Sequence, residues 1–154
     1  MSDITVDVRL ASDAWKTLAD PEALARSAFH AAARELDEEP SGEIAILLTD
    51  DGEMHRLNAQ WRGKEKPTDI LSFRAEGPGP GFLGDLALGY GICARDAADL
   101  GLALEAHVTH LFIHGLLHLL GYDHVTDDSA TVMEALEVSA LARLGLPDPY
   151  SRKA

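Results

Sequence analysis

Two histidines, His114 and His118, are four residues apart in an apolar run, and Gly121 and a third histidine, His124, follow them. On an α-helix this spacing places the first two side chains on one face, about 6 Å apart along the axis. A glycine often ends a helix in the left-handed conformation, so Gly121 would let the chain turn and bring His124 back. Three convergent imidazoles are the usual protein ligands of a catalytic zinc ion, with a fourth position left to water. The spacing therefore predicts one Zn²⁺ per chain, or another divalent transition metal that accepts three histidines.

The same spacing, H-x3-H-x2-G-x2-H, is typical of the metal-binding helix and turn of metzincin peptidases. In those enzymes a glutamate directly follows the first histidine and acts as the general base. Here Gly115 stands at that position, which argues against a peptidase. The alternative to a metal site is a buried helix whose histidines are hydrogen-bonded core residues, and three histidines at this spacing favour the metal.

Two further residues near the histidines are candidates for supporting roles. His110 would lie about 12 Å along the helix axis from His118, too far for both to bind one ion, so we expect it beside the site as an outer ligand-supporting group or a proton shuttle. Asp123 precedes His124 directly. It either orients an imidazole or hydrogen-bonds the backbone of the turn, and the sequence leaves both open.

A cationic segment, Arg62, Lys64 and Lys66, stands out in a chain whose formal net charge is −13. This charge argues against broad, non-specific nucleic-acid binding, but it allows a local basic site. Arginine binds phosphate through two parallel hydrogen bonds, and lysine binds it as a point charge. If the segment faces the metal, the three residues would bind a phosphodiester substrate, with Arg62 and His114 as the catalytic candidates.

Hydrophobic periodicity and turn residues predict how the chain is built around these residues. We expect strands over residues 4–10, 43–49, 68–73 and 84–90, and helices over about 21–36, 51–60, 93–100, 104–120 and 129–144, with a short helical piece around Trp15. Asp20 and Asp50 would cap two of these helices, and Asp127 or Asp128 the last. A polar loop is expected over 61–67 and a Gly/Pro loop over 76–81. Alternating strands and helices with short connections predict one α+β domain over 1–154, a small mixed four-stranded sheet packed with about five helices.

The remaining composition favours a cytoplasmic location. The single cysteine, Cys93, excludes a disulfide framework and a cysteine-rich zinc site. We see no signal peptide and no apolar run long enough to cross a bilayer, so we expect no membrane partner.

Three segments together resemble the bacterial YbeY family of metal-dependent endoribonucleases: RGKEKPTDILSF at 62–73, LGD at 83–85, and 110–124 with HGLLHLLGYDH. The resemblance spans about residues 43–145. It implies that His114, His118 and His124 are zinc ligands, that Arg62 is the functional arginine, and that glycine at 115 belongs to the family pattern. It also implies a small mixed sheet with helices around it.

The function that the resemblance implies is zinc-dependent, single-strand-specific RNA cleavage in ribosomal RNA maturation, at the 16S 3′ end, and in ribosome quality control. The partners would be ribosomal RNA and a ribosomal subunit or ribosome-associated proteins, without DNA. The general base stays open between a metal hydroxide, His110 and the 2′-hydroxyl of the RNA. Two alternatives are a metallopeptidase-like hydrolase and a non-catalytic, zinc-containing ribosome assembly factor.

Overall fold

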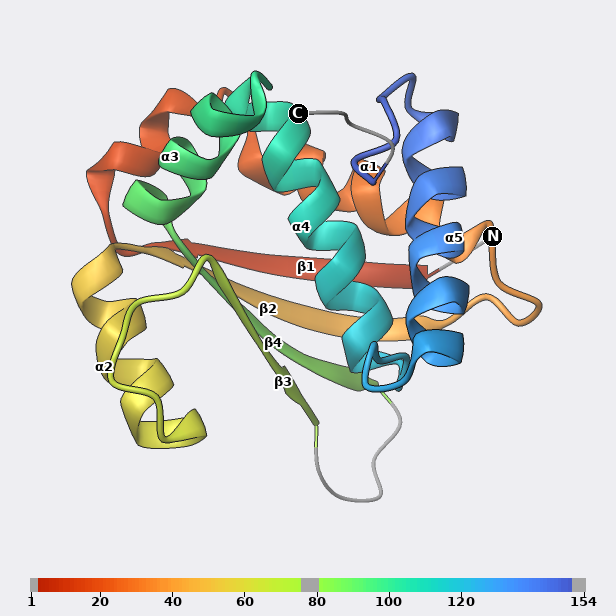
Figure 1. The fold of residues 1–154 in the computed structure, drawn as a ribbon, viewed down its shortest axis with the longest axis horizontal. Coiled ribbons are helices and arrows are strands. Elements are labelled where there is room, and N and C mark those ends of the chain that lie inside the picture. Colours follow the sequence, from red (N-terminus) through yellow and green to blue (C-terminus); the bar gives the residue numbers. More distant parts are fainter. Residues whose placement is uncertain (1–2, 76–80, 151–154) are drawn as a thin grey trace.

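The structure is a computed structural model that describes residues 3–75 and 81–150. Its centre is a four-stranded sheet in the order β1-β2-β4-β3 (Figure 1). The strands are β1 (Asp3–Leu10), β2 (Ser41–Thr49), β3 (Ile70–Arg74) and β4 (Phe82–Gly89). β1, β2 and β4 are parallel, and β3 pairs with β4 in the antiparallel direction at the edge. The predicted α+β fold with a small mixed sheet is confirmed. The predicted Gly/Pro loop lies, except for Gly81, outside the described residues.

Among the described residues, five α-helices and one short 3₁₀ helix surround the sheet. They are η1 (Asp13–Thr17), α1 (Pro21–Ala33), α2 (Asp51–Arg62), α3 (Tyr90–Leu100), α4 (Leu104–Leu119) and α5 (Asp127–Arg143). The Asp20 and Asp50 side chains cap α1 and α2 as predicted. The prediction for α5 was wrong: Thr126 caps it, in a reciprocal capping box with Ser129. Asp127 and Asp128 lie in the first turn instead, where the helix dipole favours negative charge.

The end of α2 differs from the prediction in a way that matters for the site. The helix continues to Arg62 and stops at Gly63, which is left-handed with φ 70°. Trp61 and Arg62 therefore lie in the last helical turn, not in the loop where the sequence placed them. The backbone of Arg62 is therefore fixed by the last turn of α2 rather than lying in a loop.

The two faces of the sheet are covered unequally, because alternate residues of a strand point to opposite faces. Ile44, Ile46 and Leu48 of β2 pack into the main core together with side chains of α1, α4 and α5. The opposite face carries a smaller cluster in which Leu47 and Ala87 pack with Met54 of α2. Figure 1 shows α1, α4 and α5 on one side of the sheet and α2 alone at one end of the other. In the part of the chain that the structure describes, no other helix covers this second, open face.

Helix α4 approaches the sheet closely at Gly115. A Cβ atom there would lie 2.8 Å from Leu86 Cδ2 and 3.1 Å from Ile70 Cδ1, so the position needs glycine. This contact sets the C-terminal half of α4 beside β4 and the edge strand β3. A glutamate at 115 would point into the core and away from the histidines, which explains in physical terms why the peptidase base is missing.

Among residues 3–75 and 81–150, no single helix is long and apolar enough to cross a membrane. Helices α3 and α4 reach that length only when they are taken together across a 112° bend.

Candidate metal centre

The histidine site begins at the turn that ends α4. The amide of Gly121 donates to the His118 carbonyl (3.0 Å), and the amide of Tyr122 donates to the Leu117 carbonyl (2.9 Å). These two bonds form a Schellman motif around Gly121, whose φ is 100°. The predicted positive φ at Gly121 is confirmed. The turn sends the chain back, so that the His124 ring stacks on His114 with centroids 5.6 Å apart.

The three imidazoles converge on one point. One ring nitrogen from each of His114, His118 and His124 lies within 4.8 Å of the others. The Nε2 atoms of His114 and His118 are 3.0 Å apart. Ligands at about 2.1 Å from a tetrahedral zinc ion are roughly 3.4 Å from one another. The histidine cradle, formed by His114, His118 and His124, therefore has the dimensions of such a site.

The hydrogen bonds of the two helical imidazoles leave their Nε2 atoms free to bind a cation. His118 Nδ1 lies 3.1 Å from the Tyr122 carbonyl, and His114 Nδ1 lies 2.8 Å from Glu137 Oε2. Both partners accept hydrogen bonds, so each Nδ1 carries the proton and each Nε2 presents a lone pair. Burial, followed by the neighbouring histidines, lowers the pKa of His118 and favours its neutral form. Two lone pairs facing each other at 3.0 Å fit a shared cation between them.

Glu137 is a candidate site residue that the sequence motifs did not point to. It comes from α5, is fully buried, and its carboxylate also lies 2.6 Å from His110 Nε2 and accepts a bond from the Tyr150 hydroxyl. Burial alone would raise the pKa of Glu137, but hydrogen bonds from His110, His114 and Tyr150 hold it at about 2. An ionised carboxylate therefore orients His114. Glu137 could have been found from the sequence, because a charged residue stands there between Met133 and Leu141 on the buried face of α5.

Asp123 and His110, the two candidates for supporting roles, make different contacts. Asp123 Oδ1 accepts from the Val125 amide (3.1 Å), so this side chain bonds the turn backbone, which was the second of the two roles considered for it. That amide, followed by the Ser129 hydroxyl, holds the pKa of Asp123 below its usual value. His110 contacts Glu137 and lies next to His114, with ring centroids 6.3 Å apart. It reaches the cradle through the shared carboxylate.

The cationic residues line the same hollow as the histidines. This hollow of about 820 Å³ is bordered by Arg62, Lys64 and Lys66 together with His114, His118 and His124. Arg74, which the sequence analysis did not single out, also borders it. The Arg62 guanidinium donates to the Ser72 carbonyl and lies over the Phe73 ring, 5.1 Å from its centroid.

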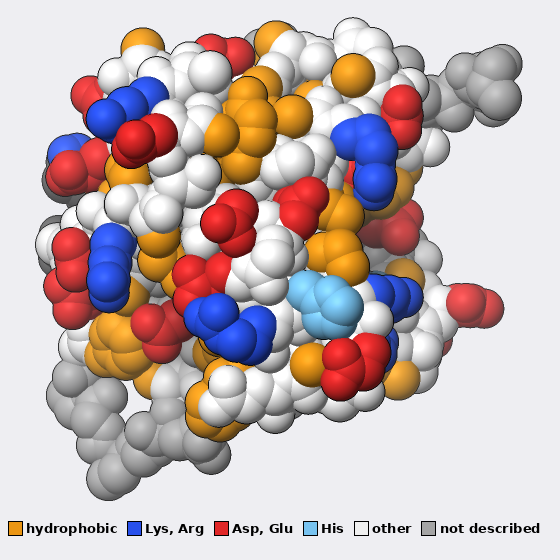
Figure 2. Space-filling view, turned by 90° about the vertical axis from the view of Figure 1, so that its left-hand side faces the viewer, with side chains coloured by type: hydrophobic (Ala, Val, Ile, Leu, Met, Phe, Trp, Pro, Cys, Tyr) orange, Lys and Arg blue, Asp and Glu red, His pale blue; other side chains and the backbone are white. Residues whose placement is uncertain are grey.

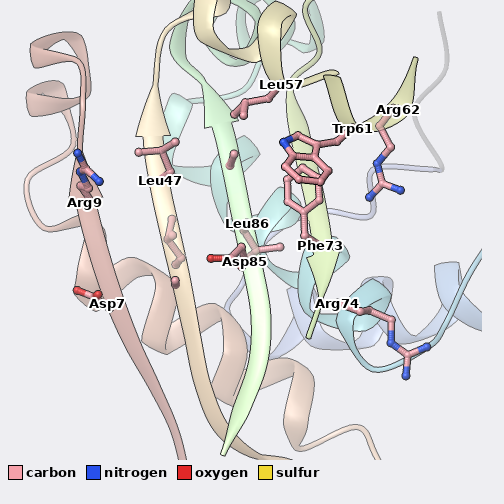
Figure 3. A pocket seen from close by; sticks show the side chains of 13 residues that line it. Asp7, Arg9, Leu47, Leu57, Trp61, Arg62, Phe73, Arg74, Asp85 and Leu86 are labelled. Carbon is pink, nitrogen blue, oxygen red and sulfur yellow. The ribbon is translucent and has the colours of Figure 1, made fainter. Parts of the chain in front are cut away.

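A second hollow, of about 710 Å³, lies on the open face of the sheet. Figure 3 shows Trp61 next to Phe73 at the edge of this hollow. Arg62 and Arg74 lie on one side of β3, and Asp85 lies on the other. The two arginines border both hollows, so the hollows adjoin across the edge strand.

Fold and site together define a small α+β protein with a candidate three-histidine metal centre beside a cationic rim. A family model described as "Endoribonuclease YbeY" matches residues 10–145. The chain belongs to this family, and the resemblance predicted from the three sequence segments is confirmed.

Individual proteins of this family are similar to the chain over most of its length. An "Endoribonuclease YbeY" of Bradyrhizobium diazoefficiens is 44% identical, over 94% of this chain and 84% of the relative. One of Maricaulis maris is 48% identical, over 94% of this chain and 91% of the relative. The solution structure of TM1509 from Thermotoga maritima shares the fold, with a TM-score of 0.54, 22% identity, and coverage of 94% of this chain and 92% of that one.

Proposed function

We propose that this chain is a metal-dependent endoribonuclease that cleaves single-stranded RNA, with ribosomal RNA as its substrate. The observation that carries the proposal is the hollow in which three convergent histidines face Arg62, Lys64, Lys66 and Arg74. The names of its relatives support cleavage within an RNA chain.

Each residue of the site has a distinct part in this proposal. A bound zinc ion would supply a Lewis acid for the phosphoryl group and an acidified water. His114, His118 and His124 hold the ion, while Glu137 and the Tyr122 carbonyl keep two of the imidazoles in the correct tautomer. Arg62 stabilises the negative charge that develops on the phosphate, and Lys64 and Lys66 attract the RNA backbone. His110 is a positioning residue that acts through Glu137.

The cellular role that we propose is maturation of the 16S ribosomal RNA 3′ end and ribosome quality control, in the cytoplasm where ribosomes are assembled. The net charge of −13 repels nucleic acid in general. Acidic side chains gather near the middle of the end formed by α2 and α3 (Figure 2). A ribosomal subunit or ribosome-associated protein that presents the RNA to the cationic hollow would overcome this repulsion.

The test is cleavage of a labelled single-stranded RNA oligonucleotide with and without chelator, beside duplex RNA and a DNA oligonucleotide of equal sequence. We expect cleavage of the single-stranded RNA alone, its loss with chelator, and its restoration by added Zn²⁺. His114→Ala should abolish it. His55→Ala is the matched control, because His55 is partly exposed and pairs with Glu65 outside the hollow. Cleavage that survives both chelator and His114→Ala would refute the proposal.

The same preparations separate the alternatives. A peptidase would cleave peptides and leave RNA intact, and Gly115 facing the core disfavours it. A non-catalytic assembly factor would keep its ribosome association after metal removal and show no cleavage of any RNA.

A further inference from the structure

The open face of the sheet holds an aromatic pair beside the proposed RNA site, in which Trp61 is exposed and Phe73 is partly buried. Trp61, in the last turn of α2, is 61% exposed, whereas Trp15 is 0% exposed in the core. The Trp61 and Phe73 rings meet edge to face, with centroids 6.4 Å apart. Phe73 belongs to β3, so the pair joins the helix end to the edge strand, and one face of an indole remains available to a ligand.

The charges around this pair favour an anionic ligand. Three arginines, Arg9, Arg62 and Arg74, border the hollow against two aspartates, Asp7 and Asp85. This local excess of positive charge contrasts with a chain of net charge −13. Arg62 and Arg74 stand between this hollow and the histidine cradle, since they border both.

We propose that single-stranded RNA runs from the histidine cradle over β3 and onto the open face of the sheet, where a base stacks on Trp61. This inference rests on the proposed function. Proteins that bind single strands combine a cationic groove with aromatic rings on which bases stack. Arg62 and Arg74 would hold the phosphates that cross the strand, and Trp61 would hold a base flanking the cleaved bond. The base pairs of a duplex hide the base faces, so the arrangement would also select single strands.

Tryptophan fluorescence tests this path directly, because Trp15 is buried and only Trp61 can be reached by a base. Titration with a 12-nucleotide single-stranded RNA in chelator should quench the emission, and duplex RNA should not. Trp61→Ala should weaken binding of the labelled oligonucleotide roughly 5- to 100-fold, as expected for one lost base stack. Trp61→Phe should retain most of the affinity. Val132→Ala, which removes another exposed apolar side chain from α5, is the control and should bind like the parent.

The outcomes separate the path from the function. Cleavage by the parent protein together with unchanged affinity in Trp61→Ala overturns the path and leaves the endoribonuclease proposal standing. Quenching by single-stranded RNA without cleavage of any RNA supports the path and overturns the proposed activity. Absence of RNA binding overturns both.

A second cluster of candidate metal ligands lies toward the start of α4, about two helical turns before His114. Asp69 precedes β3, Asp96 is in α3 and His107 is near the start of α4, and one ligand atom from each lies within 4.8 Å of the others. His107 is 5% exposed, and neither of its ring nitrogens has a hydrogen-bond partner. An imidazole buried without a partner is costly, so this group points to a missing ligand.

The chemistry of the cluster suits a cation. Burial, followed by His110, lowers the pKa of His107, which leaves a neutral ring with one lone pair. Asp69 Oδ1 accepts from the Ile70 amide at 2.7 Å, and Asp96 Oδ1 lies 3.8 Å from Arg95 Nε, so both carboxylates keep free lone pairs. Two carboxylates and one imidazole match the ligand preferences of Zn²⁺ or Mn²⁺.

We infer that a divalent transition-metal ion binds between Asp69, Asp96 and His107 and fastens β3, α3 and α4 together. Its role is structural. His107 and His114 are separated by about 10 Å along the helix axis, whereas paired catalytic ions lie about 4 Å apart.

Metal stoichiometry tests the second site on the full chain. After equilibrium dialysis against Zn²⁺, elemental analysis should give two ions per chain for the parent and one for Asp96→Asn. Asp99→Asn, on the exposed side of the same helix, should keep two. The double variant His114→Ala/His118→Ala should keep one ion and still gain thermal stability from Mn²⁺. A parent that binds one ion, which the double variant loses, overturns the inference. If Asp96→Asn does not fold, Mn²⁺ electron paramagnetic resonance of the double variant decides, and absence of bound Mn²⁺ there overturns it.

Discussion

At the scale of single residues, the site depends on groups that support the proposed ligands as much as on the ligands themselves. Glu137 bridges His110 and His114 through separate carboxylate oxygens, and the Tyr150 hydroxyl adds a third bond. A carboxylate behind a ligating histidine fixes its ring and raises its basicity. Glu137 is therefore the residue whose loss should reveal most about the cradle.

Glu137→Gln should lower metal affinity about 10- to 100-fold, because the amide keeps the shape but loses the negative charge that polarises His114. Competition with a chromophoric chelator measures the change. Glu134→Gln, one turn earlier on α5, should leave affinity unchanged. Equal affinity in the parent and Glu137→Gln would mean that Glu137 only packs the helices together.

Arg62→Glu should strongly reduce RNA cleavage and leave metal content intact. The structure adds a stability effect, because Arg62 bonds the Ser72 carbonyl and lies over Phe73, so we expect a loss of roughly 1 kcal/mol. Arg62→Lys should be intermediate, since lysine keeps the charge without the planar fork. Cleavage rate, zinc content and melting temperature are measured on the same preparations. Arg56→Glu, on the same helix and outside both hollows, is the control. Full activity in Arg62→Glu would remove Arg62 from the mechanism.

At the scale of elements, the end of α4 converts a helical spacing into a three-sided cradle. The helix alone supplies two histidines on one face, and the Schellman turn supplies the third. Gly115 adds the close helix–sheet contact that places this end of α4 beside β3, which carries Arg74. The positions of the three histidines are therefore set by the end of α4 and the turn that follows it.

Gly121→Val should weaken metal binding, because a β-branched residue resists a φ of 100°. The added Cβ would be 3.5 Å from Arg74 Nη1, an ordinary contact, so the effect would come from the backbone. Gly145→Val is the matched control: its φ of 74° imposes similar strain at the end of α5, where nothing lies within 4 Å. Both variants should lose stability, and only the first should lose metal affinity, measured by chelator competition. Equal affinities would show that the turn does not place His124.

At the scale of the whole molecule, a strongly acidic chain presents its cations in a restricted region. Arg62, Lys64, Lys66 and Arg74 border the histidine hollow, and the first and last of these also border the open face. RNA contact should therefore be confined to few phosphates, while the rest of the surface repels the backbone.

The salt dependence of RNA binding should accordingly be shallow. Four phosphate contacts predict a slope of about −3 for the logarithm of the binding constant against the logarithm of salt concentration on a single strand. Fluorescence anisotropy of a labelled oligonucleotide across a salt series gives the slope. Lys66→Gln should reduce its magnitude by about one contact, and Arg26→Gln on α1 should leave it unchanged. A slope of about −6 or steeper would indicate a much larger contact surface than this hollow.

Features that depend on local geometry could be predicted from the sequence alone. The spacing of His114, His118 and His124 around Gly121 predicted their convergence, because helix pitch and a left-handed glycine set those positions with neighbouring residues alone. Strands and helices that alternate along the chain with short connections likewise predicted the small mixed sheet. Tertiary structure decided what depends on packing between distant segments. It brought Glu137 behind His114, set Arg62 and Arg74 across β3 from the open face, and buried His107 against Asp69 and Asp96. No local sequence pattern predicts these long-range contacts, because they follow from how α4 and α5 pack on the sheet and on each other.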